Sequence, residues 1–283
     1  MSRLIHRAAA ITAVLSAARI VLRRRRAISF AGRTIVISGG SRGLGLELAR
    51  LFAAEGARLV LLARDSAELD RAAKELQSRS AQVLPIPCDL RDVDSIARST
   101  ATIRQWSGMV DVLINNAGII QVGPFETMDR KDFEEALAVH LWGAFELTRN
   151  LLPLMIRNGR IVNIASIGGI VAVPHLLPYC VSKFALVGLS DGLRAELSRR
   201  QIRVTTVCPG LMRTGSHVQA WFKGQQKKNS RSSHWPVLYR YFRPLRVMRH
   251  NASSKRVVMA TPSCLSPRKR ALFIWQTPSC PIP

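Results

Sequence analysis

Three side chains in the second half of the chain have the types and spacing of a proton-transfer site. Tyr179 and Lys183 are four residues apart in a predicted helix, so both side chains lie on one helix face. A phenol with a pKa of about 10 is a weak base at neutral pH, and a nearby ammonium lowers that pKa. Ser166 precedes Tyr179 by 13 residues and can donate a hydrogen bond to a substrate oxygen that gains negative charge. We therefore predict general acid–base chemistry centred on Tyr179.

The elements that must position these groups alternate between strand and helix. The predicted strands are continuous apolar runs, which is typical of strands buried on both faces of a parallel sheet. They are Thr34–Ser38, Arg58–Ala63, Gln82–Pro87, Asp111–Asn115, Arg160–Ala165 and Arg203–Cys208. The predicted helices are Gly43–Glu55, Ser66–Arg79, Val93–Trp106, Arg130–Arg149 and Pro178–Arg199. This alternation predicts an α/β fold with a doubly wound parallel sheet, the Rossmann fold, in a single domain over residues 31–224.

A glycine cluster joins the first predicted strand to the first predicted helix. It reads Ser38-Gly39-Gly40-Ser41-Arg42-Gly43-Leu44-Gly45. Glycines permit a tight turn and let the backbone approach a pyrophosphate at the positive end of the following helix. The cluster therefore predicts a dinucleotide site at the top of the sheet.

The spacing of this cluster resembles the TGxxxGxG motif of the short-chain dehydrogenase/reductase family, with Ser38 in place of the threonine. Asn115-Asn116-Ala117-Gly118 resembles the NNAG motif of the family, and Ser166, Tyr179 and Lys183 follow in family order. The resemblance covers residues 34 to 214. It implies a nicotinamide-dependent oxidoreductase that interconverts an alcohol and a carbonyl on a small-molecule substrate, as a homodimer or homotetramer. It implies cofactor contacts from Gly39, Ser41, Arg42, Gly43, Leu44, Gly45, Arg64, Asp89, Leu90, Asn116, Ala117, Gly118, Tyr179, Lys183, Pro209, Gly210 and Thr214.

Charge at the end of the second predicted strand favours NADP over NAD. An NAD site usually has an acidic residue there, which holds the ribose hydroxyls. In this chain Ala63 occupies that position and Arg64 follows, while Asp65 comes one residue too late. Arg64 and Arg42 could both face a 2′-phosphate, which arginine binds through two hydrogen bonds. By resemblance to the family, this pair implies NADP.

His140 stands where the family commonly has an asparagine that holds a water relaying protons to the lysine. A histidine could hold that water and would add a pH-sensitive group. It could instead mark a weakened or altered relay. We include His140 among the candidate catalytic residues.

The basic residues are concentrated in the two flanks. All 18 carboxylates lie between Glu47 and Glu196, and only 16 of the 42 Lys and Arg residues lie there, so the other 26 flank this stretch. A near-neutral core argues against a nucleic-acid-binding domain. The five cysteines form no CxxC pair and no metal-ligand cluster, so we predict reduced thiols and no metal site.

The flanking segments leave several interpretations open. Residues 1–30 combine an apolar stretch over 8–22 with Arg23 to Arg26, which fits a membrane-surface helix, a short span, a secretory signal or a mitochondrial presequence. We favour membrane association with the enzyme domain in the cytoplasm. Residues 225–283 form a basic tail, in which Arg256–Met259 or Ala271–Trp275 is the best candidate for a seventh strand.

The loop between Ser166 and Tyr179 is apolar, which favours a lipophilic substrate unless these side chains pack the core instead. The segment Gly215–Gly224 is where the family places its substrate lid. A second class of function also fits the sequence: a catalytically weak relative that serves as a binding or membrane-tethered module. The unusual tail favours that second class.

Overall fold

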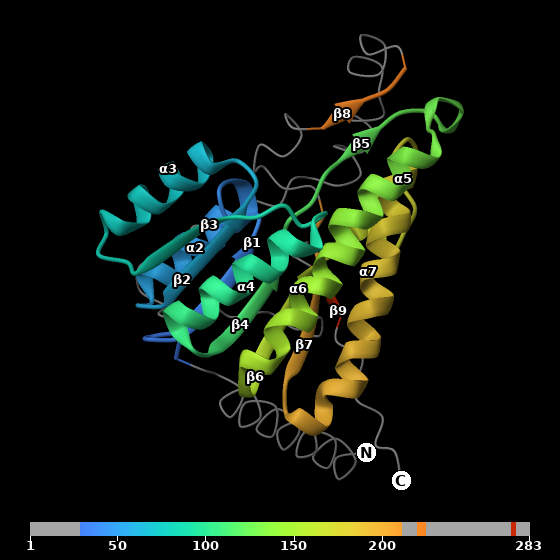
Figure 1. Cartoon of the computed structure of the whole chain (residues 1–283). Coiled ribbons are helices and arrows are strands. Elements are labelled where there is room, and N and C mark those ends of the chain that lie inside the picture. Colours follow the sequence, from blue (N-terminus) through green and yellow to red (C-terminus); the bar gives the residue numbers. More distant parts are fainter. Residues whose placement is uncertain (1–28, 211–219, 225–272, 276–283) are drawn as a thin grey trace, which may run out of the picture.

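The computed structural model describes residues 29–210, 220–224 and 273–275. Its main sheet has the strand order β3-β2-β1-β4-β6-β7-β9 (Figure 1). The strands are β1 (Thr34–Ser38), β2 (Arg58–Ala63), β3 (Val83–Pro87), β4 (Val110–Asn115), β6 (Met155–Ile164), β7 (Arg203–Cys208) and β9 (Phe273–Trp275). The first six are parallel, and β9 pairs antiparallel with β7. The chain therefore has the predicted doubly wound Rossmann sheet.

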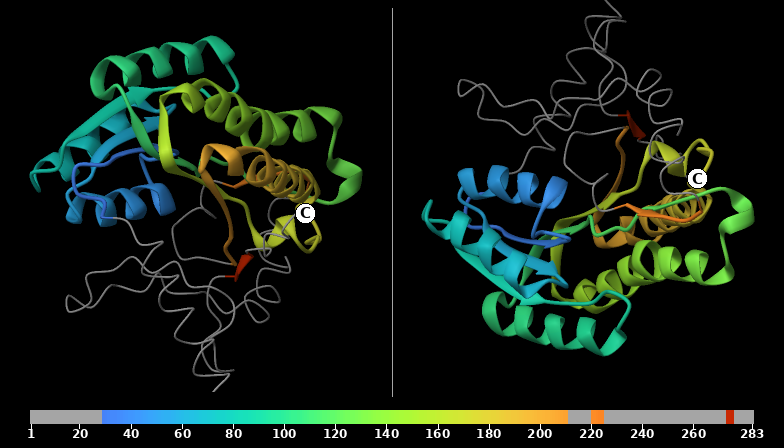
Figure 2. Two further views of the ribbon diagram at one scale, coloured as in Figure 1. Left: turned by 90° about the horizontal axis from the view of Figure 1, so that it is seen from below. Right: turned by 90° about the horizontal axis from the view of Figure 1, so that it is seen from above.

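Helices cover both faces of this sheet (Figure 2). They are α2 (Gly43–Ala54), α3 (Ser66–Gln77), α4 (Val93–Ser107), α5 (Arg130–Leu137), α6 (Gly143–Leu151) and α7 (Leu177–Glu196). Alternate residues of a strand point to opposite faces. In β1, Ile35 and Ile37 pack in the cluster that contains α2 and α3 side chains, whereas Val36 packs in the cluster that contains α4 and α6 side chains. Two apolar cores thus hold the sheet between helix layers.

The predicted boundaries of β1, β2 and β7 are confirmed, most other elements begin and end within about three residues of prediction, and two elements differ more. β6 begins at Met155, because the strand continues through Asn158, which has a φ of +64°, and Gly159, a pair that reads as a turn in the sequence. The predicted helix Arg130–Arg149 is two α-helices joined by a π-helical turn over Ala138–Trp142. The hydrogen-bond partners of His140 in this turn come from distant segments, so the local sequence does not reveal it.

A second, two-stranded sheet lies beyond the carboxyl ends of the main strands. β5 (Gln121–Val122) pairs parallel with β8 (Trp221–Phe222), and Lys223 then binds Asp129 and Asp132 at the start of α5. These contacts attach the end of the predicted lid segment Gly215–Gly224 to the domain. The predicted seventh strand is β9, within Ala271–Trp275, while Arg256–Met259 lies outside the described residues, as do the segment 1–28 and most of the tail. In the described ranges no helix is long and apolar enough to cross a membrane.

Candidate active site

The glycine turn is shaped by backbone approaches that admit no side chain at two positions. A Cβ at Gly45 would lie 2.0 Å from the Gly39 carbonyl oxygen, and one at Gly39, where φ is +67°, would lie 2.9 Å from the Ala117 Cα. The Asn116 amide donates to the carbonyls of Ser38 and Gly39, at 3.1 Å each. The turn therefore packs directly on the segment after β4.

The helix after this turn begins without a protein cap. Arg42 is the N-cap of α2, its side chain makes no capping hydrogen bond, and the first turn contains no acidic residue. Free N–H groups and the positive end of the helix dipole suit a phosphate. This uncapped terminus and the side-chain-free turn fit the pyrophosphate of a dinucleotide.

Tyr179, Lys183 and Ser166 converge at the carboxyl edge of the sheet. Ser166 follows β6, and a Cβ at Gly168 would lie 3.5 Å from its hydroxyl oxygen and 3.3 Å from the Tyr179 ring, so the two side chains lie close together. The Lys183 ammonium donates to the Ile164 carbonyl at 2.7 Å and lies 5.8 Å from the Tyr179 ring centroid. A Cβ at Gly169 would lie 2.8 Å from the Lys183 carbonyl oxygen, so this glycine lets the loop after Ser166 pack tightly on α7. The structure thus brings the three predicted groups together.

The protonation of these groups differs from our prediction that Lys183 lowers the pKa of Tyr179. Burial raises the pKa of Tyr179 to about 12, and the hydrogen bond from Ser166 only partly opposes this. Burial also lowers the pKa of Lys183 to about 7. Desolvation disfavours the charged form of both groups, and it is the largest cause of both pKa shifts. Tyr179 is therefore a protonated phenol here, which is a proton donor.

His140 lies in the π-helical turn and uses both ring nitrogens. Its Nε2 accepts from the Ile119 N–H at 3.0 Å, and its Nδ1 lies 2.7 Å from the Ser182 hydroxyl, which donates to the Tyr179 carbonyl at 2.8 Å. The acceptor role of Nε2 places the proton of a neutral imidazole on Nδ1. Burial, and then the Lys183 charge, hold the pKa of His140 well below its usual range. The imidazole therefore has no nitrogen left for the relay water that we expected it to hold.

A network of buried amides supports the site, and sequence reasoning missed it. The Asn115 amide donates to the Asn163 side chain at 2.8 Å and to the Thr148 hydroxyl at 3.1 Å, and the Asn163 amide donates to Ser190 at 2.8 Å. Asparagine near the carboxyl end of two apolar strands is the signal that could have revealed it, because buried amides need partners. The network ties β4 and β6 to α6 and α7 beneath the catalytic groups.

The residues predicted near the adenosine end are charged and partly exposed. The Arg42 guanidinium binds the Glu68 carboxylate at 2.8 Å, and Ser41 donates to the same carboxylate at 3.3 Å. Arg64 is exposed directly after β2. The Arg91 guanidinium, with a smaller effect from Arg64, holds the pKa of Asp89 below its usual range.

Of the remaining predicted cofactor residues, the structure describes all but Thr214. Leu90 is buried, with its Cβ only 2.7 Å from where a Cβ of Gly143 would stand. Pro209 accepts a hydrogen bond from the Ile167 N–H at 2.9 Å, and Gly210 follows it. Thr214 lies outside the described residues.

A Rossmann sheet, a side-chain-free glycine turn and a Ser–Tyr–Lys group at one edge define a class of protein, the dinucleotide-dependent oxidoreductases. A family model described as short chain dehydrogenase matches residues 33–224. Oxidoreductase UcpA of Salmonella typhimurium is 38% identical over 186 residues, which are 65% of this chain and 70% of that protein. Dehydrogenase/reductase SDR family member 7B of Mus musculus is 37% identical over 217 residues, which are 73% of this chain and 66% of that protein.

Solved structures of the same family also match this chain. A short chain dehydrogenase/reductase of Burkholderia phymatum in complex with NAD matches with a TM-score of 0.66 and 27% identity, covering 68% of this chain and 70% of that one. A metagenomic short-chain oxidoreductase in complex with NADP matches with a TM-score of 0.61 and 34% identity, covering 66% of this chain and 86% of that one. The chain belongs to the short-chain dehydrogenase/reductase family and is an NAD(P)-dependent oxidoreductase.

Proposed function

We propose that this oxidoreductase uses NADP to interconvert an alcohol and a carbonyl on a lipophilic substrate, with Tyr179 as the general acid and base. The observation that carries the proposal is the convergence of Tyr179, Ser166 and Lys183 beside the glycine turn. When bound, the nicotinamide would supply or accept the hydride. The protein must then hold the substrate oxygen and move one proton to or from it.

Ser166 is suited to hold the substrate oxygen, and Tyr179 is suited to transfer the proton. The Ser166 oxygen accepts from the Gly168 N–H at 3.1 Å, and its hydroxyl hydrogen, which serves Tyr179 in the structure, would donate to the substrate oxygen as charge develops there. The Tyr179 phenol, with a pKa of about 12, is ready to donate a proton to a carbonyl oxygen. In the oxidative direction the same phenol must lose its proton, and a charged Lys183 favours that form. The protonated phenol is the form that donates a proton during carbonyl reduction.

The preference for NADP rests on two arginines and one absent carboxylate. Ala63 ends β2 where an NAD site usually has an acidic residue, and Arg64 follows it. Arg42 stands at the start of α2, close to the predicted phosphate site. A 2′-phosphate would gain charge-assisted hydrogen bonds from both guanidinium groups. The related structures contain NAD in one case and NADP in the other, so the preference for NADP depends on these side chains.

A lipophilic substrate is supported by apolar side chains exposed around the loop after Ser166. Ile170 is 41% exposed and Val171 is 56% exposed in that loop, so they do not pack the core. Trp221, in β8, is 50% exposed, and β8 pairs with β5, which follows the Asn116–Gly118 segment. Such exposed apolar surface near a catalytic group is suited to an apolar ligand.

Two measurements on the full chain test this proposal. Fluorescence titration with NADPH and NADH should show tighter binding of NADPH, and tighter binding of NADH would overturn the NADP assignment. Oxidation of NADPH should then be followed with aliphatic, aromatic and steroid aldehydes and ketones. Tyr179→Phe should bind NADPH like the native protein and lose turnover by about 10²-fold or more. Full activity in this variant would refute the role of the phenol.

A further inference from the structure

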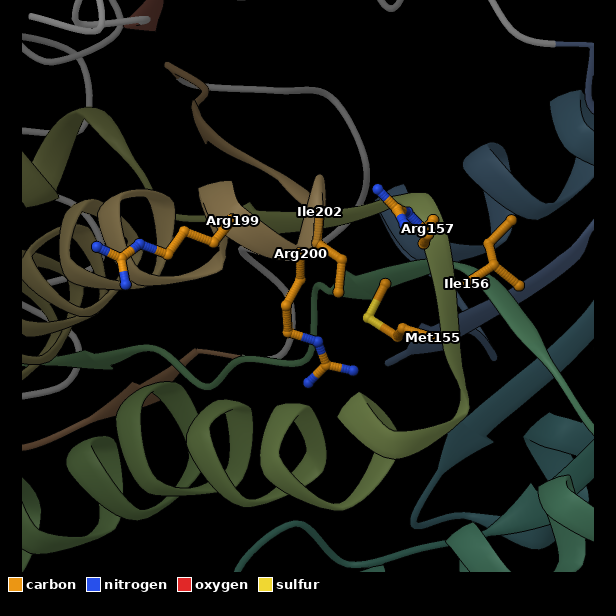
Figure 3. A pocket seen from close by; sticks show the side chains of 6 residues that line it. All are labelled: Met155, Ile156, Arg157, Arg199, Arg200 and Ile202. Atoms are coloured by element: carbon orange, nitrogen blue, oxygen red, sulfur yellow. The ribbon is translucent and has the colours of Figure 1, made fainter. Parts of the chain in front are cut away.

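A basic hollow lies at the end of the domain opposite to the candidate active site. Its volume is about 260 Å³, and three arginines and three apolar residues line it (Figure 3). The lining residues are Met155, Ile156, Arg157, Arg199, Arg200 and Ile202. In Figure 3 the side chains of Arg200 and Met155 extend toward the same space, while Arg199 and Arg157 lie to either side. A concave site of this composition suits an anionic group.

Chain direction explains why this hollow is remote from the cofactor. β6 begins at Met155 and β7 begins at Arg203, and the two strands are parallel, with Arg160 opposite Arg203. Their starts therefore meet at the amino edge of the sheet, whereas Ser166 lies past the carboxyl end of β6. The hollow belongs to the amino edge, which the oxidoreductase chemistry does not use.

The positive charge at this edge is uncompensated. Arg157, Arg199, Arg200 and Arg203, here called the basic edge, are all exposed. Arg200 donates to the Leu152 carbonyl at 3.0 Å, but none of the four forms an ion pair with a carboxylate in the part of the chain that the structure describes. Elsewhere in the domain, arginines commonly pair with carboxylates in ion pairs. Burial and the neighbouring charge of Arg203 lower the pKa of Arg160. Cations gathered without counter-charges favour an external anion.

The chain enters the domain at this same edge. β1 begins at Thr34 and runs parallel to β4, which runs parallel to β6. The 28 residues that precede the described region contain seven arginines, no acidic residue and the apolar stretch 8–22. An apolar stretch beside clustered arginines is suited to the boundary of an anionic bilayer. The basic edge and the residues that precede β1 are therefore both suited to an anionic membrane surface.

We propose that the basic edge docks on a membrane surface that contains anionic phospholipids, with a headgroup phosphate in the hollow. Arg157, Arg199 and Arg200, which line the hollow, would supply charge-assisted hydrogen bonds to phosphate oxygens. Because the hollow and the catalytic groups lie at opposite ends of the strands, docking turns the candidate active site away from the bilayer. The proposal is independent of the cofactor and substrate assignments.

Flotation of the full chain with vesicles tests the proposal. The vesicles contain phosphatidylcholine alone or phosphatidylcholine with phosphatidylserine, at low salt because the attraction is screened within a Debye length. The variant is R157Q/R199Q/R200Q, and the matched control is R71Q/K74Q/R104Q, which removes three exposed cations of α3 and α4. Each basic residue at an anionic surface contributes about 1 kcal/mol, or roughly fivefold in partitioning. We expect the variant to lose up to about 100-fold on phosphatidylserine vesicles, with the control unchanged.

Several results would overturn the proposal. One is native partitioning of the variant on phosphatidylserine vesicles while thermal unfolding shows that it is folded. Another is equal binding of all three proteins to both vesicle types, which would assign the binding to apolar contacts alone. Binding of inorganic phosphate in calorimetry without a preference for phosphatidylserine vesicles would assign the hollow to a soluble anion. Loss of binding to a single-stranded RNA, with flotation unchanged, would assign the edge to nucleic acid.

Discussion

The buried His140 should make the stability of the protein depend on pH in a way that one substitution removes. In the folded protein the imidazole stays neutral, because burial and Lys183 hold its pKa well below its usual range and its Nε2 accepts the Ile119 N–H. In the unfolded chain a histidine has a pKa of about 6.5 and takes up a proton below that value. The unfolded state then binds more protons than the folded state, so stability falls as pH falls.

The size of this effect follows from linkage. Each pH unit below about 6.5 removes about 1.4 kcal/mol of unfolding free energy for one proton, so lowering the pH to about 5 removes roughly 2 kcal/mol. For a domain of this size that is about 4–8 °C in Tm. His140→Asn removes the titrating group. We expect the variant to be less stable than the native protein at neutral pH, because the Ile119 N–H and the Ser182 hydroxyl lose their partner. It should nevertheless lose less stability on acidification.

Urea unfolding measured at several pH values between about 7 and 5 tests this prediction, since this window lies above the ordinary pKa of the carboxylates. The charged and titratable neighbours of His140 are Lys183 and Tyr179, and both stay unchanged in the variant. His175→Asn is the control, because position 175 has a φ of +64°, which asparagine tolerates. Parallel pH curves for the native protein and His140→Asn would show that His140 titrates alike in both states. They would refute the closed hydrogen-bond network.

Three further predictions concern the turn, the cofactor and assembly. Glu68→Gln should free Arg42 and raise the preference for 2′-phospho-AMP over AMP in calorimetry by about two- to fivefold, the range expected for an exposed ion pair. The control Glu75→Gln, which affects the ion pairs with Arg50 and Arg79, should leave that preference unchanged, and an unchanged ratio in Glu68→Gln would separate Arg42 from the phosphate site. Gly45→Ala should lower the free energy of unfolding in urea by about 1–3 kcal/mol and weaken NADPH binding, because its Cβ would meet the Gly39 carbonyl. The control Gly188→Ala, in open space on α7, should not destabilise the protein, and equal stability of the two variants would contradict the packing of the turn. Sedimentation velocity should show that the native protein is a homodimer or homotetramer. The apolar side chains of Trp142 and Phe184 are 58% and 44% exposed, so the double variant Trp142→Glu/Phe184→Glu should be a monomer. A monomeric native protein would refute the predicted assembly.

Much of the fold could be predicted because its strands are buried on both faces. Continuous apolar runs such as Thr34–Ser38 and Arg203–Cys208 leave little freedom in where a strand begins and ends, and both boundaries are confirmed. The glycine turn was also predictable, because the close approach at Gly45 excludes every other residue. Local sequence therefore determined these features.

Other features depend on contacts between distant segments. The spacing of Tyr179 and Lys183 predicts that they are neighbours but says nothing of their burial, and burial decides the direction of both pKa shifts. The π-helical turn at His140 depends on partners from the loop after β4 and from α7, 21 and 42 residues away in sequence. The Asn115–Asn163 pair joins two strands 48 residues apart. None of these contacts has a local pattern.

The most direct test of the account follows one hydrogen atom. NADPH that carries deuterium at the transferring C4 position is incubated with the full chain and with the best carbonyl compound of the panel, and the alcohol product is analysed by mass spectrometry. We expect deuterium on the carbinol carbon with the native protein, and a rate lower by about 10²-fold or more with Tyr179→Phe. Absence of transfer to every carbonyl while NADPH is bound, or transfer at the native rate by Tyr179→Phe, would contradict it.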